Sequence, residues 1–282
     1  MLIEQTFSTG PATLNYAATH EPGPPLLLLH GVTTRWQAWL SLMPLLSQQW
    51  QVWAPDFRGH GRSSRVAGGY RGEDFAADII TFLEHRVQQP AVIIGHSLGG
   101  LVTTYIAAVR PDLVRAVVLG DSPIHVESLT HSAYPELFTK VREYLVQRMS
   151  LPELMRALAN TELHSPRGSA LMKDLPFNDE AYFRWWAQSL VQLDPEVLEM
   201  AIDGRTAENW RGSEFIKQIR CPVMLMQADP KWGGIMTAED VACAKSVLRD
   251  VVHVCLEGVS HALHIHQPGP VARALGNFLG SL

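Results

Sequence analysis

Long apolar runs are missing from this sequence of 282 residues. None approaches the roughly 18 consecutive apolar residues that a membrane-spanning helix needs. The opening residues, Met1 to Thr6, also lack the basic and apolar segments of a secretory signal. We therefore expect a cytoplasmic protein with no membrane partner.

Cysteine and positive charge are both scarce. The three cysteines, Cys221, Cys243 and Cys255, cannot pair completely, and their spacing fits neither a zinc knuckle nor a Cys-x-x-Cys redox pair. We interpret them as small apolar residues in a reducing compartment. The net charge is −5, and no basic stripe of the kind that nucleic-acid binding needs is present. We therefore expect no nucleic-acid partner.

Apolar residues are abundant, at 46% of the sequence against 18% charged, which is enough to bury a large core. Short apolar runs bounded by glycine or proline predict buried strands, and amphipathic stretches between them predict helices. The predicted strands are 26–29, 51–54, 91–94, 116–119, 223–226 and 251–256, with helices at 74–86, 98–109 and 271–279 and an antiparallel edge hairpin within 2–18. Strands buried on both faces and joined by helices predict a mostly parallel α/β sheet with helices on both faces.

One region departs from this alternation. Between residues 124 and 212 the pattern is helical, and we find no convincing strand. The helices predicted there are 136–148, 151–159, 181–191 and 195–203. We interpret the region as a helical cap over the carboxyl ends of the strands, where ligands of such sheets bind. The chain is then divided into core 1–123, cap 124–212 and core 213–282.

The strongest chemical signal is Gly95-His-Ser97-Leu-Gly99-Gly100. It follows a predicted strand and opens a predicted helix, the context that a nucleophile elbow requires. Small residues at positions 95 and 99 relieve crowding around a strained turn. The helix then directs its first amides, including that of Leu98, at an anion formed on the serine.

A serine hydroxyl needs a neighbouring base, and His261 follows the last predicted strand at the same sheet edge. His264 and His266 stand close behind it, so the three histidines also permit a metal-cluster interpretation. No suitably spaced carboxylate or cysteine accompanies them, and we expect no metal. His261 is therefore our predicted general base.

The base needs a carboxylate to fix its tautomer. Two aspartates end core strands, Asp229 and Asp121, and both fit the chain order serine, acid, histidine. We favour Asp229, because its strand neighbours the one that carries His261 in sequence, and keep Asp121 as the alternative. The second oxyanion amide is predicted at Val32, in Leu29-His-Gly-Val32.

These pieces resemble the α/β-hydrolase superfamily, in the cap-bearing branch that holds esterases, lactonases and carbon–carbon bond hydrolases. The matching pieces are His30-Gly31, Asp56-Phe-Arg-Gly-His-Gly-Arg-Ser63, the elbow, Asp229 and Gly258-Val-Ser-His261. The resemblance implies an eight-stranded sheet, with Ser97 as nucleophile, Val32 and Leu98 as oxyanion amides and His261 as base. The turn before the acid departs from the family's longer Gly-x-x-Asp pattern.

The segment 56–63 also invites a phosphate-loop interpretation, because it contains Gly59-x-Gly61. It has no Gly-Lys-Ser or Gly-Lys-Thr ending and does not lead directly into a helix. We interpret it as a structural loop beside the active edge.

We expect a cofactor-free acyl hydrolase that cleaves a carboxylic ester, with lactone opening, carbon–carbon hydrolysis or perhydrolysis as alternatives on the same residues. Ser97 argues against epoxide opening and dehalogenation, which use an aspartate at the elbow. A small-molecule receptor on this scaffold is the non-enzymatic alternative. The expected substrate is small, neutral and apolar, with His96, Trp185 and Trp186 as pocket residues. The sequence does not indicate an oligomeric state.

Overall fold

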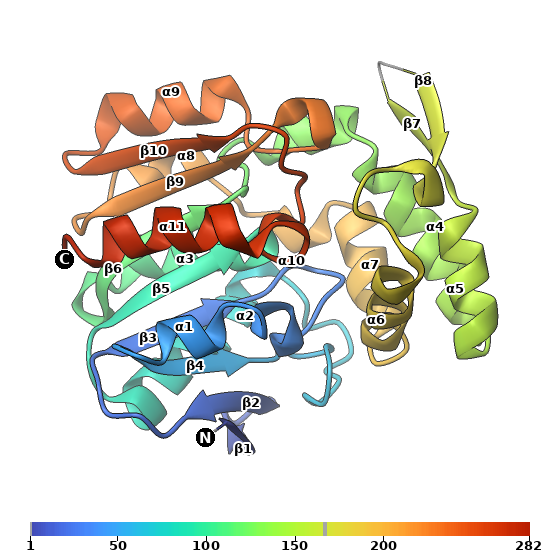
Figure 1. The fold of residues 1–282 in the computed structure, drawn as a ribbon. Helices are drawn as coiled ribbons and strands as arrows, with labels where there is room; N and C mark the ends of the chain where they lie inside the picture. The colour runs from blue at the N-terminus through green and yellow to red at the C-terminus, as the bar shows by residue number, and fades with distance from the viewer. Residues whose placement is uncertain (1, 166–167) are drawn as a thin grey trace.

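The computed structural model describes residues 2–165 and 168–282. Eight strands form one sheet in the order β1-β2-β4-β3-β5-β6-β9-β10 (Figure 1). Their bounds are β1 Leu2–Ser8, β2 Thr13–Thr19, β3 Pro25–Leu29, β4 Gln51–Pro55, β5 Ala91–His96, β6 Val114–Gly120, β9 Val223–Ala228 and β10 Val251–Leu256. β1 and β2 pair antiparallel at one edge, β2 also runs antiparallel to β4, and the remaining pairs are parallel. The predicted sheet and its edge hairpin are confirmed.

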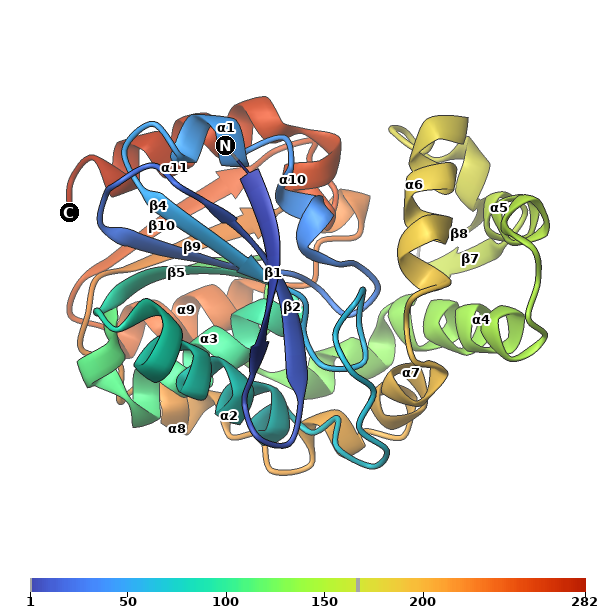
Figure 2. The same ribbon diagram turned by 90° about the horizontal axis from the view of Figure 1, so that it is seen from below.

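Two layers of helices enclose the sheet. The core helices are α1 Met43–Leu46, α2 Gly72–Phe82, α3 Leu98–Val109, α8 Gly212–Ile216, α9 Ala238–Val247, α10 Leu263–His266 and α11 Pro268–Leu279. Helices α1, α10 and α11 cover one face, and α2, α3, α8 and α9 cover the other (Figure 2). The predicted helices 98–109 and 271–279 correspond to α3 and α11.

Alternation along the strands explains why both faces need helices. In β3, Leu27 and Leu29 join the apolar cluster under α2 and α3, while Leu26 and Leu28 join the cluster under α1 and α11. All four side chains are fully buried. Because neighbouring side chains of a strand point to opposite faces, a continuous apolar run is stable only between two helical layers.

The segment between β6 and β9 forms a separate group of helices beyond the carboxyl ends of the strands (Figure 1). Its main elements are α4 Tyr134–Val146, α5 Leu151–Ala159, α6 Glu180–Leu190 and α7 Pro195–Ile202. A short antiparallel hairpin joins them, β7 Glu162–Ser165 with β8 Gly168–Leu171, so the prediction of no strand in this region is wrong. Each strand has only four residues, too few to show an alternating pattern. The predicted cap range includes residues 166 and 167, which lie outside the described residues.

The two ends of this insertion meet at Ile124. The carboxylate of Asp240, on α9, accepts a hydrogen bond from the Ile124 amide at 3.0 Å. Trp210, on the returning segment, donates its indole N–H to the Ile124 carbonyl at 2.8 Å. The chain therefore leaves and re-enters the core through one small set of contacts.

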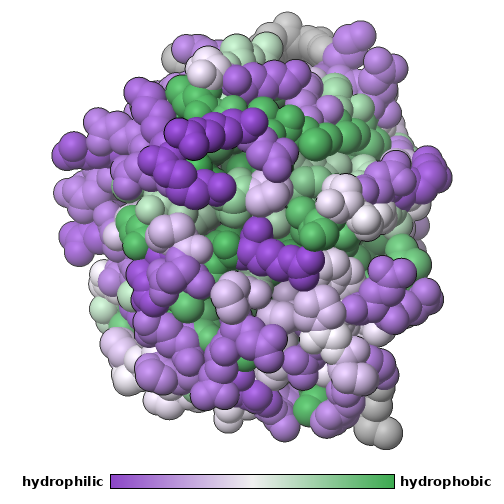
Figure 3. Space-filling model, turned by 90° about the vertical axis from the view of Figure 1, so that its left-hand side faces the viewer, coloured by the Kyte–Doolittle hydropathy of each residue, from purple (hydrophilic) through white to green (hydrophobic). Residues whose placement is uncertain are grey.

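Among the described residues, no helix combines the length and the apolar character needed to cross a bilayer. On the face opposite the cap, hydrophilic side chains are interspersed with apolar ones (Figure 3). That face presents no unbroken apolar surface.

Candidate active site

Ser97 lies at a sharp turn between β5 and α3. Its backbone angles, φ 54° and ψ −118°, are strained for a residue with a side chain. The Ser97 amide donates to the Gly120 carbonyl at 3.0 Å, and the amides of Gly100 and Leu101 donate to the Ser97 carbonyl at 2.8 and 3.1 Å. These bonds hold the strained turn in place at the carboxyl edge of the sheet.

The neighbouring glycines are required by close backbone contacts. A side chain on Gly95 would collide with the backbone of Gly99, and one on Gly99 would collide with the Leu29 carbonyl. The elbow therefore packs directly on the end of β3, which brings the following turn beside Ser97.

His261 and Asp121 form a short hydrogen bond at the same edge. Nδ1 of His261 lies 2.6 Å from Oδ2 of Asp121, which is fully buried at the end of β6. The Asp121 carboxylate also accepts from the amides of Ile235 at 2.9 Å, Met236 at 3.2 Å and Ala228 at 3.2 Å. An ionised carboxylate is needed to satisfy so many donors.

The electrostatics of Asp121 favour the ionised form. Burial acts to raise the pKa of the Asp121 carboxyl, but the hydrogen bond and charge of His261 and the amides of Ile235 and Met236 outweigh it. The pKa is lowered below its ordinary value. Asp121 is therefore a carboxylate at neutral pH, and it holds the proton of His261 on Nδ1.

The prediction that Asp229 contacts His261 is wrong. Asp229 Oδ1 accepts from the Lys231 amide at 2.8 Å and Oδ2 accepts from the Gly258 amide at 3.0 Å, so its carboxylate closes turns. The sheet order explains the error. β6 lies between β5, which carries the serine, and β9, so the acid on β6 is one strand nearer to Ser97.

The turns that carry the two predicted oxyanion amides lie beside Ser97. A Cβ placed on Gly31 would lie 3.3 Å from the Ser97 Cβ, so the turn carrying Val32 touches the serine. Leu98 is the first residue of α3. In the described part of the chain, neither the Val32 amide nor the Leu98 amide has a hydrogen-bond acceptor. Two free N–H groups beside a serine can stabilise an oxyanion.

The predicted pocket residues divide into two groups. His96 is 4% exposed, and its Nε2 lies 2.8 Å from the His261 carbonyl oxygen, so it contacts the loop that carries His261. Trp186 is 3% exposed on α6, and its role in the pocket stays a prediction, as does that of His96. Trp185 is half-buried on α6, and its ring centroid lies 6.1 Å from that of Tyr182, which also stacks with Trp186. Trp185 stays a predicted pocket residue.

The sequence analysis missed Tyr134, the first residue of α4. Its ring lies edge-on to the imidazole of His261, with centroids 5.0 Å apart. Burial, then the Asp121 charge, then Tyr182 raise the pKa of the Tyr134 phenol. No sequence pattern marks this contact, because it depends on how the cap packs on the core.

His264 and His266 have contacts of their own. His264 stacks on Trp39 with ring centroids 3.9 Å apart, and His266 Nδ1 lies 2.7 Å from the Ser260 hydroxyl. Among the described residues, no three histidine, cysteine, aspartate or glutamate side chains are grouped as metal ligands would be. The metal-cluster interpretation therefore gains no geometric support from them.

We predict that His264→Phe raises the melting temperature and weakens its pH dependence. Within the described residues both ring nitrogens of His264 are buried without a partner, which costs about 1–3 kcal/mol. Burial lowers the pKa of His264 well below its ordinary value. Below about pH 6.5 the histidine therefore binds a proton in the unfolded chain but not in the folded chain. The free energy of unfolding consequently decreases as the pH is lowered. Thermal melts of both proteins between pH 5 and 8 are the test, and an unchanged slope would contradict it.

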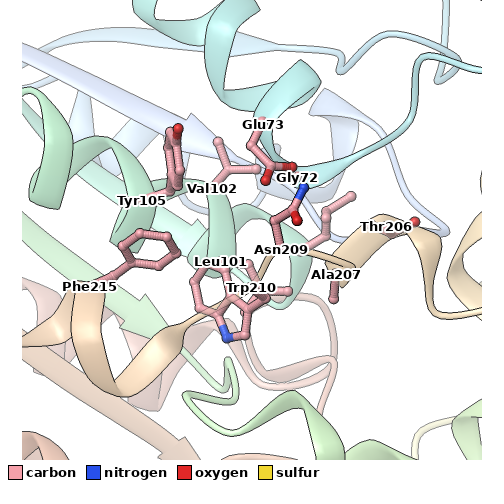
Figure 4. Close-up of a pocket in the computed structure, with 11 residues that line it drawn as sticks. Gly72, Glu73, Leu101, Val102, Tyr105, Thr206, Ala207, Asn209, Trp210 and Phe215 are labelled. Atoms are coloured by element: carbon pink, nitrogen blue, oxygen red, sulfur yellow. The ribbon is translucent and has the colours of Figure 1, made fainter.

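A small cavity lies beside α3. Its volume is about 20 Å³, and apolar side chains of Leu101, Val102, Tyr105, Trp210 and Phe215 form most of its wall (Figure 4). Neither the serine nor the histidine lines it. Leu98, whose amide is a predicted oxyanion donor, is among its lining residues.

Residues 24–194 match the family described as alpha/beta hydrolase fold. The chain belongs to the α/β-hydrolase family. A soluble epoxide hydrolase from a Corynebacterium species is 30% identical to this hydrolase over 225 residues, which cover 70% of this chain and 77% of the relative. The 2-(acetamidomethylene)succinate hydrolase of Mesorhizobium japonicum is 36% identical over 126 residues, 45% of each chain. The hydrolase thus spans less than half the length of this last relative.

Solved structures show the same fold over the whole hydrolase. A crystal structure of E-2-(acetamidomethylene)succinate hydrolase covers 99% of this chain and 100% of its own, with a TM-score of 0.76 and 22% identity. The epoxide hydrolase CorEH covers 100% of both chains, with a TM-score of 0.73 and 19% identity. At these identities the likeness establishes the fold and leaves the reaction to be argued from the site.

Proposed function

We propose that this hydrolase cleaves a carboxylic ester or lactone of a small, neutral, largely apolar substrate through an acyl-enzyme on Ser97. The observation that carries the proposal is the bond between His261 Nδ1 and Asp121 at the edge where the strained serine projects. With its proton held on Nδ1, His261 presents an unprotonated Nε2 to accept the serine proton. Ser97 also argues against epoxide opening, because that reaction uses an aspartate at the elbow.

The proposed reaction has two half-reactions. Ser97 Oγ bonds to the acyl carbon while His261 takes its proton, and the carbonyl oxygen becomes an anion facing the amides of Val32 and Leu98. The C–O bond to the leaving alcohol breaks as His261 returns the proton to that alcohol. Water then attacks the acyl-serine with His261 as base, and the carboxylic acid and free Ser97 are regenerated.

The apolar cap supports the substrate class. Tyr182 and Trp185 project from α6, while the cap cation Arg184 is on its exposed side. Burying a methylene against such a surface contributes about 0.8 kcal/mol. We therefore expect kcat/KM to rise from acetyl to butyryl p-nitrophenyl esters and to be low for a succinyl monoester.

Trp185→Ala should reduce the butyryl-to-acetyl ratio of kcat/KM several-fold, because the variant removes apolar surface from the proposed pocket. Arg184→Ala, on the same helix, is the matched control and should leave the ratio unchanged. Steady-state kinetics on both esters measure the effect. Equal ratios in all three proteins would place the acyl group away from α6.

A second candidate is hydrolysis of an unsaturated amido dicarboxylate. Two relatives carry such names, the Mesorhizobium enzyme and an (E)-2-((N-methylformamido)methylene)succinate hydrolase of Acinetobacter baylyi, 32% identical over 126 residues. In the same panel, a succinyl ester that outperforms the butyryl ester would favour this candidate. It would also mean that a cation reaches the substrate.

A further inference from the structure

The segment from Asp56 to Ser63, interpreted from sequence as a structural loop, lies against the turn that carries the proposed oxyanion amide. Nε2 of His60 is 2.7 Å from the carbonyl oxygen of Val32. The amide of Phe57 donates to Nε2 of His30 at 3.0 Å. This one segment is therefore hydrogen-bonded both to His30 and to Val32, within the turn that carries the proposed oxyanion amide.

The contacts of His30 establish its tautomer. Because Nε2 accepts from a backbone N–H, it carries no proton, and the ring proton must be on Nδ1. That nitrogen lies 2.8 Å from the Gly31 carbonyl oxygen and therefore donates to it. Burial lowers the pKa of His30 to about 4, so this neutral tautomer persists at neutral pH.

The Gly31 carbonyl is held by Thr34 as well. The Thr34 amide and hydroxyl both donate to it at 3.2 Å. This carbonyl and the Val32 N–H belong to one planar peptide group and point in opposite directions. Three donors on the oxygen therefore fix the direction of the N–H.

His60 holds the next peptide group. Its two nitrogens face two carbonyl oxygens, that of Val32 at 2.7 Å and that of Arg58 at 2.9 Å. Burial lowers the pKa of His60 to about 4, so one nitrogen carries a proton at neutral pH. We assign it to Nε2, which makes the shorter contact. His60 then anchors Val32 through its carbonyl oxygen, and its ring centroid lies 5.0 Å from that of His30.

The same loop also touches the cap. The amide of Asp194, which caps the N-terminus of α7, donates to the Gly59 carbonyl at 2.8 Å. The hydroxyl of Tyr70 donates to the Asp194 carboxylate at 2.7 Å. The loop is thus held from both sides, and its position relative to the oxyanion turn is defined.

We propose that His30 and His60 are positioning residues that aim the Val32 amide at the oxyanion. This inference rests on the proposed serine acyl hydrolysis and adds the groups that orient its charge-stabilising donor. Neither histidine touches the substrate in this proposal. Each acts through one carbonyl oxygen of the turn, His30 through Gly31 and His60 through Val32.

The experiment uses the two amide side chains as matched replacements. In place of histidine, an asparagine amide nitrogen lies near the Nδ1 position and a glutamine amide nitrogen lies near the Nε2 position. His30→Asn and His60→Gln therefore keep the donor that the proposal requires, whereas His30→Gln and His60→Asn lose it. Each variant that loses the donor therefore has a control with the same amide group at the same position.

The expected result is that asparagine is the more active replacement at position 30 and glutamine is the more active replacement at position 60. Removing an oxyanion donor costs about 10²–10³ in kcat, and misdirecting one should cost about 10- to 100-fold. We expect that loss in His30→Gln and His60→Asn, with p-nitrophenyl butyrate KM nearly unchanged. The affinity for a trifluoromethyl ketone, which forms a tetrahedral adduct on the serine, should fall in proportion. His30→Asn and His60→Gln should retain most activity.

A role limited to holding the fold makes a different prediction. With such a role the substitutions change the urea midpoint of unfolding. The same replacement, asparagine or glutamine, is then not favoured at one position and disfavoured at the other for its hydrogen bonding, because only packing distinguishes the two side chains. If kcat follows stability in all four variants, or if ketone affinity does not follow kcat, the positioning role is overturned. Wild-type protein without ester turnover and without serine labelling by a fluorophosphonate would instead overturn the proposed function itself.

Thr34 provides a second test if a histidine variant does not fold. Thr34→Val removes the hydroxyl donor to the Gly31 carbonyl at nearly constant shape, and Thr34→Ser retains it. The valine variant should lose a few-fold in kcat and in ketone affinity together, and the serine variant should lose neither. Equal kinetics in the two variants would contradict a peptide group held through its carbonyl.

Discussion

Ser97→Ala should abolish covalent labelling by a fluorophosphonate probe and reduce p-nitrophenyl butyrate turnover by about 10⁴ to 10⁶ in kcat. The loss is large because serine, histidine and aspartate act as a unit, and without the nucleophile only binding and the oxyanion amides act on the ester. Mass spectrometry of the labelled protein and steady-state kinetics measure the two effects. Circular dichroism should show an intact fold, since alanine fits the space of serine.

Labelling that persists in Ser97→Ala would place the nucleophile elsewhere and would refute the proposed site. Ligand binding by the wild-type protein with neither labelling nor turnover would favour a receptor on this scaffold. The wild-type labelling experiment therefore separates enzyme from receptor before any substrate is known.

Asp121→Asn should cost about 10⁴ in kcat, because an amide facing Nδ1 favours the wrong tautomer of His261. Asp229→Asn is the matched control, an equal change at the end of the neighbouring strand β9. It removes one acceptor from turns at Lys231 and Gly258 and should change kcat far less. Comparing kcat for both variants with one ester is sufficient.

The reverse ranking of the two variants would show that the contact between Asp121 and His261 is not the catalytic one. Equal losses would indicate that both act through the stability of the loop that carries His261. Urea unfolding of each variant distinguishes these outcomes, since a tautomer effect leaves the midpoint nearly unchanged.

Local patterns were sufficient to predict the sheet, the core helices α2, α3 and α11, and the elbow. The strand before Ser97 and the helix after it follow from apolar runs and glycines that are adjacent in sequence. The carboxylate partner of His261 was not predictable in this way. Its choice depends on the order of strands in space, where β6 lies between β5 and β9, and sequence order favoured Asp229.

Contacts between the cap and the core were also outside the reach of sequence patterns. Tyr134 meets His261 only because α4 packs over the histidine loop. Similarly, His60 was placed in a structural loop, and its bond to the Val32 carbonyl became visible only with the loop folded against β3. Each of these depends on the approach of segments far apart in the chain, which periodicity does not report.

The junction at Ile124 has a consequence for how this protein can change over evolution or in the laboratory. Because the departing and returning chains are tied to the same residue, the core closes around the insertion whatever its length. The entropy of closing such a loop grows only slowly with its length, by about 0.6 kcal/mol per doubling. Insertions of other lengths can therefore be joined to the core at this junction, provided that they keep the contacts of Tyr134 with His261 and of Asp194 with Gly59.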